Sequence, residues 1–275
     1  MIKPDPENGS TMAVLSEHSV TLAAALVVAL IGFAMIWPVS VARRDASLVD
    51  VVWGPGFIVQ LGVVAILASA SGGRARLLLI LVGVWSLRLG WTLIRRRVRE
   101  CREDARYTAM RRSWGDGFWW KSLFVVFILQ AFLQWLVVLG PAVGMLTDDQ
   151  NLGALAVAGC ILAAGGLLLE TVADLQLDRY KRAQRGGHGL LTTGLRAHVR
   201  HPNYVGEIVF WMGISLIVLE GGTILGVLSP VLIIVFLTRI SGAPLLDERL
   251  SETRPGYAAY RARVPGFIPS FRNSP

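Results

Sequence analysis

Charged residues are scarce in this chain of 275 residues: they make up 17% of it, whereas an average soluble protein has roughly 25%. The mean hydropathy is correspondingly high, at +0.54. Cysteine is rarer still, with only Cys101 and Cys160 in the sequence. Two cysteines can provide neither a disulfide framework nor a cysteine-based metal site. These shortages argue against a soluble enzyme and against a small secreted domain.

Motifs that identify common enzyme classes are also missing. No Gly-x-Gly-x-x-Gly fingerprint follows a strand and no Walker-type loop occurs. No Gly-x-Ser-x-Gly sequence suggests a hydrolase. The four histidines do not have the spacing of metal ligands; they are His18, His188, His198 and His201. We therefore expect no bound metal, and any nucleotide must be held by helix ends and loops.

Apolar runs are abundant, and many reach the length of about 20 residues that crosses a hydrocarbon core of ~30 Å. Seven membrane spans are predicted, over residues 20–39, 48–70, 77–94, 123–145, 152–175, 205–219 and 223–237. Only Glu220-Gly221-Gly222 joins the last two, which predicts a tight helical hairpin. The sequence thus predicts an all-α, polytopic membrane protein.

Arginine supplies most of the formal net charge of +8 and lies after spans three, five and seven. Since Lys and Arg mark the cytoplasmic side, we expect the C-terminus inside and the N-terminus outside. The first ~18 residues lack the pattern of a cleaved signal peptide, so the first helix is interpreted as a retained anchor. We expect an integral membrane protein of the bacterial inner membrane, or of the endoplasmic reticulum in a eukaryote.

Charged residues inside or beside the spans are functional candidates by default, because burying them near lipid is costly. The alternative is that they are helix-end residues paired with nearby arginines. A site with many arginines and a few carboxylates suits a ligand that has several phosphates and a ribose. The candidates are Asp50, Arg88, Glu170, Asp174 and Glu207.

The most specific stretches are Gly-Leu-Arg-Ala-His-Val-Arg-His-Pro-Asn-Tyr-Val-Gly-Glu at 194–207, Leu-Asp-Glu-Arg-Leu at 246–250, and the Pro- and Tyr-containing segment 254–269. Together they resemble the C-terminal cofactor half shared by steroid 5α-reductases, sterol reductases and isoprenylcysteine carboxyl methyltransferases. Within that superfamily the chain resembles the bacterial branch of steroid 5α-reductases. The match is specific over about 170–269 and looser before it. No internal repeat, linker or low-complexity region divides the sequence, so one membrane domain is predicted over 1–275. The resemblance implies substrate-side helices in 1–145 and the cofactor half in 146–275.

The resemblance implies NADPH as the cofactor. The family's Asn-x-x-Gly-Glu motif falls at Asn203, Gly206 and Glu207, and its polar pair before a basic residue falls at Glu170, Asp174 and Lys181. An aromatic position beside the adenine falls at His188, and the basic residue after span seven at Arg239. The implied cofactor-binding set is Arg96, Arg99, Glu170, Asp174, Lys181, His188, Arg200, His201, Asn203, Tyr204, Glu207, Arg239 and Glu248.

The resemblance also implies hydride delivery to the β-carbon of an enone, with a Gln-Glu pair and a Tyr holding the carbonyl oxygen. The chain departs from this pattern, because Val49-Asp50 replaces Gln-Glu and Trp85 replaces the Tyr. The candidate catalytic residues are therefore Asp50, Trp53 and Trp85. A carboxylic acid buried against apolar walls can stay protonated near neutrality and donate to the carbonyl. If Asp50 is not the acid, the next candidates are Tyr107 and an ordered water.

The leading interpretation is an NADPH-dependent reductase of a 3-oxo-Δ4 steroid or a similar apolar enone. Its expected partners are that lipid-like substrate and the bilayer, with no nucleic acid. One alternative is a methyltransferase that uses S-adenosylmethionine, of the isoprenylcysteine carboxyl methyltransferase type. Another is a non-enzymatic membrane bundle. Glu207, Asp174 and Lys181 favour the reductase, because they suit a larger cofactor with phosphates.

Overall fold

The structure, a computed structural model, describes residues 6–100, 102–147, 152–184, 189–240 and 242–269. Helices make up 84% of it, and these ranges contain no strand. The all-α fold class is therefore confirmed.

Seven helical segments of the described chain are long and apolar enough to cross a membrane: Ser19–Arg43, Leu48–Leu67, Gly73–Arg99, Ala105–Leu146, Ala154–Ala183, Pro202–Glu220 and Ile224–Thr253. Each overlaps one predicted span, so the prediction of seven spans is confirmed by length and composition. The direction in which the chain crosses the membrane stays a prediction.

The helices in chain order are α1 (Pro6–Glu17), α2 (Ser19–Arg43), α3 (Leu48–Leu67), α4 (Gly73–Glu100), α5 (Ala105–Trp114), α6 (Phe118–Ser122), α7 (Leu129–Leu146), α8 (Ala154–Ala183), α9 (Pro202–Glu220), α10 (Leu228–Val235), α11 (Ala243–Thr253) and α12 (Tyr257–Arg263). Short 3₁₀ turns occupy Gly115–Gly117, Gly194–Ala197 and Ile224–Val227, and π-helical turns occupy Leu123–Ile128 and Phe236–Ile240.

Several helices run past the predicted ends of their spans. α4 has 28 residues, which corresponds to a length of about 42 Å at 1.5 Å per residue. It is longer than a hydrocarbon core of ~30 Å, and arginine is a good helix former. The basic residues after Ile94 therefore continue the helix where a loop was predicted. Beyond the predicted end of span seven, the described residues form a π-helical turn over Phe236–Ile240 and the helix α11 over Ala243–Thr253.

The chain divides into two compact units, which are described separately. The first unit contains Met1–Ala156 and Ser215–Ser229, and the second contains Val157–Ile214 and Pro230–Pro275.

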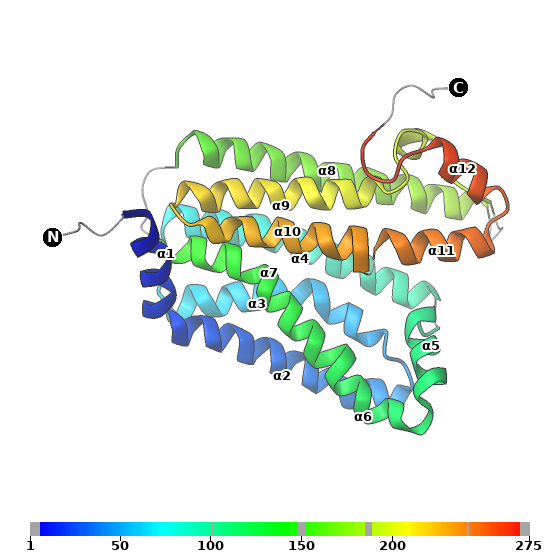
Figure 1. The fold of residues 1–275 in the computed structure, drawn as a ribbon, viewed down its shortest axis with the longest axis horizontal. Helices are drawn as coiled ribbons and strands as arrows, with labels where there is room; N and C mark the ends of the chain where they lie inside the picture. Colours follow the sequence, from blue (N-terminus) through cyan, green and yellow to red (C-terminus); the bar gives the residue numbers. More distant parts are fainter. Residues whose placement is uncertain (1–5, 101, 148–151, 185–188, 241, 270–275) are drawn as a thin grey trace. The chain divides into compact units, whose positions relative to one another are not determined.

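The first unit is built on α2, α3, α4 and α7, with α5 and α6 at one end of these helices (Figure 1). α3 and α4 approach closely, because a Cβ placed on Gly54 would lie 2.6 Å from the backbone nitrogen of Gly90. The Ser86 hydroxyl also donates to the Gly54 carbonyl across the same contact. The side chain of Gln134 on α7 fills the space beside Gly56. These contacts fix α3, which carries Asp50 in its first turn.

In the second unit α8 and α9 approach closely through small residues. A Cβ on Gly166 would lie 2.4 Å from the backbone nitrogen of Phe210. A Cβ on Gly206 would lie 2.7 Å from Cγ of Glu170. The glycine of the Asn-x-x-Gly-Glu motif is thus required for packing, and it brings the buried Glu170 side chain against the start of α9.

Two neighbouring glycines of α8 give a matched stability prediction. Gly166→Ala is expected to destabilise the protein by about 1–3 kcal/mol, because the new methyl group meets backbone atoms that cannot move aside. Gly165→Ala meets nothing within 4 Å and should be neutral or stabilising by up to about 1 kcal/mol, since alanine favours the helix. Thermal unfolding of both variants in detergent checks this, and equal melting temperatures would contradict the packing described.

Candidate functional site

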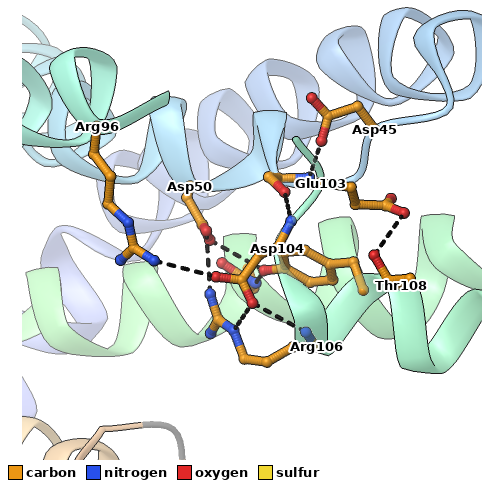
Figure 2. Close-up of polar contacts among 10 residues, drawn as sticks. Asp45, Asp50, Arg96, Glu103, Asp104, Arg106 and Thr108 are labelled. Carbon is orange, nitrogen blue, oxygen red and sulfur yellow. Dashed lines mark hydrogen bonds and ion pairs between the residues drawn. The ribbon is translucent and has the colours of Figure 1, made fainter. Parts of the chain in front are cut away.

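Asp50 faces two donors from the start of α5. Its Oδ1 accepts a hydrogen bond from the Tyr107 hydroxyl at 3.0 Å. Its Oδ2 lies 3.2 Å from Nη2 of Arg106 in an ion pair. Figure 2 shows Asp50 facing Arg106, with Asp104 between Arg106 and Arg96. The first turn of α3 is therefore joined to α5 by a carboxylate, a guanidinium and a phenol.

Asp104 holds α5 in this position. It is the N-cap of α5, and its carboxylate accepts from the Arg106 backbone N–H and from Nε of Arg106, each at 3.0 Å. The Asp104 N–H in turn donates to Oγ of Ser47 at 2.7 Å. Burial alone would raise the pKa of Asp104, but the N–H and guanidinium of Arg106 outweigh burial and lower it. The cap thus stays ionised and orients Arg106 toward Asp50.

Other arginines of this region are engaged by acids of the same unit. Arg111 makes a forked pair with Glu103, at 2.7 and 3.1 Å, and Arg97 pairs with Asp45. Arg96 lies 3.4 Å from Asp104. The Arg97 pair joins α4 to the segment before α3, and the Arg96 pair joins α4 to the residue that caps α5. The predicted cofactor residue Arg96 therefore lies beside Asp50's neighbours, whereas Arg99 is exposed on α4.

A small polar pocket opens beside Asp50. Its volume is about 30 Å³, and it is lined by Ser47, Asp50, Val51, Leu93, Arg96, Arg97, Arg102 and Asp104. A volume of this size holds about one or two waters and is far below the roughly 300 Å³ of a small-molecule pocket. The pocket therefore gives solvent access to the Asp50 carboxyl and leaves no room for a lipid.

Tyr107 lies on the apolar side of the same cluster. Its side chain is 4% exposed, and its hydroxyl accepts from Nε2 of Gln130 on α7 at 3.1 Å. The guanidinium carbon of Arg106 lies 5.2 Å from the centre of the Tyr107 ring. Tyr107 belongs to a cluster of buried apolar residues whose other members are Ala29, Phe33, Ala46, Val49, Phe118, Val126, Phe127 and Ala131.

From the sequence alone, Tyr107 is a candidate for the catalytic acid only if Asp50 is not, and Arg106 and Gln130 are not candidates at all. A signal was present, because Tyr107 is the only tyrosine before Tyr180. With Trp85 lacking a hydroxyl, Tyr107 is the one phenol that the N-terminal helices can supply.

Trp53 and Trp85 belong to a row of aromatic contacts in this unit. The Trp53 and Phe57 rings meet edge to face with centres 5.8 Å apart, and Phe57 and Trp85 with centres 5.0 Å apart. Trp85 is fully buried. The Trp53 carbonyl accepts from the side-chain amide of Gln134. The two predicted tryptophans are thus brought into one apolar row, in which neither has a hydroxyl to offer a carbonyl.

The second unit has a cluster centred on Asp247 of α11. Its carboxylate accepts from the Tyr257 hydroxyl, lies 3.0 Å from Nε2 of His201 and 3.2 Å from Nη2 of Arg200. The backbone N–H groups of Arg200 and His201 donate to the carbonyls of Pro265 and Gly266, at 2.9 and 3.2 Å. The three sequence stretches that carry the family resemblance therefore meet at this acid.

The other predicted residues of this unit differ in their surroundings. The Tyr204 ring stacks on His201 at 5.3 Å between centres. Asp174 acts electrostatically on Arg196, where burial lowers the pKa of the guanidinium and Tyr260 and Asp174 oppose that shift. Asn203 and Glu207 are half-buried in the first turns of α9, and Lys181, Arg239 and Glu248 are exposed. His188 lies outside the described residues.

The buried acid beside Arg200 and His201 is Asp247, the neighbour of the predicted Glu248. Both acids are present in the quoted stretch 246–250, and their sequence alone does not decide which of them faces inward. In the structure the Asp247 side chain of α11 is buried, with 5% of it exposed, whereas Glu248 is exposed.

Several buried donors of the second unit have no hydrogen-bond partner within the described chain. They are Nε of Arg196, Nε and Nη1 of Arg200, and Nδ1 of His201, the last a donor or an acceptor according to its tautomer. Buried polar atoms are nearly always paired. Guanidinium groups with free N–H donors are suited to phosphate or carboxylate oxygens. The cluster therefore has the chemistry to receive an anionic ligand.

Comparison of the sequence with known protein families finds a match. Residues 36–264 match the family described as "Protein of unknown function (DUF1295)". The chain belongs to this family. DUF1295 contains steroid 5α-reductase-like proteins. No curated protein matches the chain, and no solved structure matches it. In the described part of this DUF1295 member, no group of three or more His, Cys, Asp or Glu side chains could hold a metal.

The Asp247 cluster predicts a pH dependence for this DUF1295 protein. Burial lowers the pKa of His201 from its ordinary 6.5 to about 4, with Arg200 and Arg196 acting in the same direction and Asp247 opposing them. Between pH 6.5 and about 4 the unfolded chain thus binds a proton that the folded chain does not. This contribution to stability is full above pH 6.5 and is lost as the pH falls toward 4.

We expect the melting temperature to fall more steeply over this range in the wild type than in His201→Gln. Glutamine cannot titrate, but its amide can still donate to Asp247. Thermal unfolding at a series of pH values checks this. Parallel curves for the two proteins would contradict the buried, neutral state of His201.

Proposed function

We propose that the protein reduces the C=C bond of an apolar enone, such as a 3-oxo-Δ4 steroid, with NADPH as the hydride source. The observation that carries the proposal is the Asp50–Tyr107 hydrogen bond at 3.0 Å. It puts a carboxyl group and a phenol together at the border between a solvent-accessible pocket and an apolar cluster. Membership of DUF1295, which contains steroid 5α-reductase-like proteins, supports the same reaction class.

An enone that accepts hydride at its β-carbon develops negative charge on its oxygen. Preorganised hydrogen-bond donors aimed at such an oxygen are the largest common source of rate enhancement. Asp50 and the groups bonded to it can supply these donors and a proton. The surrounding apolar residues exclude water, which strengthens hydrogen bonds to a developing charge. Steroid-like substrates are themselves apolar and can reach such a cluster from the bilayer.

The second unit has residues suited to the cofactor. NADPH, when bound, supplies the hydride. Arg196 and Arg200 would hold its phosphates with the donors that lack protein partners. Glu170, Asp174, Asn203 and Glu207 would hold ribose and amide groups, because carboxylates accept from hydroxyls and amides can both donate and accept. We keep NADPH as the expected nucleotide, since a 2′-phosphate suits this basic environment.

The test is a thermal-shift measurement on purified protein in detergent, with NADPH, NADH or S-adenosylmethionine added separately. A ligand at 100 times its dissociation constant stabilises by about 2.7 kcal/mol. We expect the largest rise in melting temperature with NADPH. Asn203→Ala and Glu207→Ala should reduce that rise, whereas Glu252→Ala, which changes an exposed acid of α11, should not.

The methyltransferase alternative predicts a different outcome of the same measurement. The unpaired donors of Arg200 also suit the carboxylate of S-adenosylmethionine. Stabilisation by that compound and none by NADPH would replace the reductase by a methyltransferase. Stabilisation by none of the three would favour a non-enzymatic membrane protein.

A further inference from the structure

The Tyr107 hydroxyl has the surroundings of a proton donor rather than of a structural phenol. When a phenol gives up its proton, the oxygen left behind is negative and needs donors or cations nearby. Gln130 already donates an N–H to this oxygen at 3.1 Å. The Arg106 guanidinium lies 5.2 Å from the ring centre. Once the neighbouring Asp50 carboxylate has taken up a proton, a phenolate at this position would be stabilised by a hydrogen bond and by a positive charge.

Exposure distinguishes the two ends of the Asp50–Tyr107 pair. The Asp50 side chain is 27% exposed and lines the polar pocket. The Tyr107 side chain is 4% exposed and lies in the apolar cluster. Solvent protons can therefore reach the carboxyl of Asp50 but not the phenol directly. The hydrogen bond between them is the connection from solvent to the apolar side.

We propose that Tyr107 is the catalytic acid and that Asp50 restores its proton from solvent; this inference rests on the proposed enone reduction. In the resting protein Asp50 accepts from the phenol and pairs with Arg106. Solvent therefore first protonates its carboxylate through the pocket, and the Asp50 O–H then donates to the phenol oxygen while the phenol O–H turns to the enone.

As hydride from the nicotinamide forms a C–H bond at the β-carbon, the Tyr107 O–H bond breaks and an O–H bond forms on the former carbonyl oxygen. After the transfer to the enone, the phenolate takes the proton of Asp50, which leaves Asp50 as the carboxylate with which the cycle began. The resulting enol tautomerises to the saturated ketone, so the C=C bond is reduced and the nicotinamide oxidised.

The remaining members of the cluster position these two groups. Arg106 is fixed by the Asp104 cap and holds Oδ2 of Asp50, which leaves Oδ1 facing the phenol. Gln130 holds the phenol from α7. In this arrangement Tyr107 of α5 provides the hydroxyl donor, because Trp85 has no hydroxyl.

The experiment compares single-turnover oxidation of bound NADPH by an enone steroid in wild type, Tyr107→Phe, Gln130→Leu and the matched control Tyr180→Phe. Tyr107→Phe keeps the ring in its apolar cluster and removes only the hydroxyl. We expect its rate to fall about 10²- to 10⁴-fold, the usual contribution of general acid catalysis. Gln130→Leu should show a smaller loss, and Tyr180→Phe none. NADPH affinity should be unchanged in all four proteins.

A second readout does not depend on turnover. The infrared carbonyl stretch of a bound, isotopically labelled enone, without nucleotide, should lie at lower frequency in the wild type than in Tyr107→Phe, because the hydroxyl donates to the carbonyl. A purely structural phenol would leave the stretch unchanged. Melting temperatures identify any variant that fails to fold.

The outcomes separate this inference from the proposed function. Wild-type turnover that persists in Tyr107→Phe, with an unshifted carbonyl stretch, overturns the role of Tyr107 and leaves the reductase standing. Failure of the wild type to oxidise NADPH with any enone overturns the proposed function, and the role of Tyr107 with it. Loss of turnover together with loss of the stretch shift supports both.

Discussion

Replacing Asp50 by asparagine is expected to lower the steady-state rate of enone reduction by about 10²- to 10⁴-fold. The variant keeps the shape of the side chain and can still contact Arg106 and Tyr107. Asparagine cannot, however, pass a proton from solvent to the phenol. NADPH binding should change little, because no cofactor contact is proposed for Asp50. Steady-state turnover with an enone steroid, alongside NADPH binding, measures both quantities.

A structural role for Asp50 predicts the opposite. Asp50 is at the start of α3 and pairs with Arg106, so it could serve only to join α3 to α5. Asparagine serves helix starts about as well as aspartate, and turnover would then stay near that of the wild type. Asp116→Asn is the matched control, since Asp116 is exposed in the turn after α5 and should keep full activity.

Asp247→Ala is expected to destabilise the protein by about 3–5 kcal/mol, the usual cost of removing one partner from a buried ion pair. The variant leaves the donors of Arg200, His201 and Tyr257 without their shared acceptor. The contacts that join α11 to α12 and to the chain around His201 through the Asp247 carboxylate should then be lost in the same step. Thermal unfolding in detergent measures the change.

The adjacent acid provides the control for this prediction. Glu248 is exposed on α11, so Glu248→Ala should change the free energy of unfolding by no more than about 0.5 kcal/mol. Similar losses in the two variants would contradict the central position of Asp247. Limited proteolysis should cut the C-terminal segment faster in Asp247→Ala than in the wild type or Glu248→Ala.

The membrane architecture could be predicted because it depends on local composition. A bilayer requires runs of about 20 apolar residues, and seven such runs are visible without any structure. Helix ends were less predictable, since a hydrophobic pattern stops where lipid stops. α4 and α8 continue beyond the predicted spans. The backbone hydrogen bonds that hold a helix together are made within the helix, so it can extend past the edge of the membrane.

The candidate sites depend on contacts between distant segments, which composition does not reveal. Asp50 could be proposed from its place in an apolar run, but Tyr107 is 57 residues away in sequence. Its position follows from the Asp104 cap and the Ser47 hydrogen bond. The arginines around Asp104 concealed it, since basic clusters beside spans are expected for topological reasons alone.

The packing role of Gly206 could not be predicted from the sequence motif either. The motif identified it as part of a cofactor signature, and the structure gives it a packing role against Glu170. Glycine at such a position allows two helices to approach closely. A motif can thus contain residues that support a site beside residues that would touch the ligand, and only the structure separates them.

Transfer of a labelled hydride from NADPH to an enone is the direct test of the proposed reduction. Purified protein in nanodiscs is incubated with an enone steroid and NADPH that bears deuterium at the transferring position of the nicotinamide. Mass spectrometry and NMR then locate the label in the product. The proposed reduction gives a saturated ketone with one deuterium on the former β-carbon. NADPH that stays unoxidised with the enone, or a product without deuterium, would contradict it.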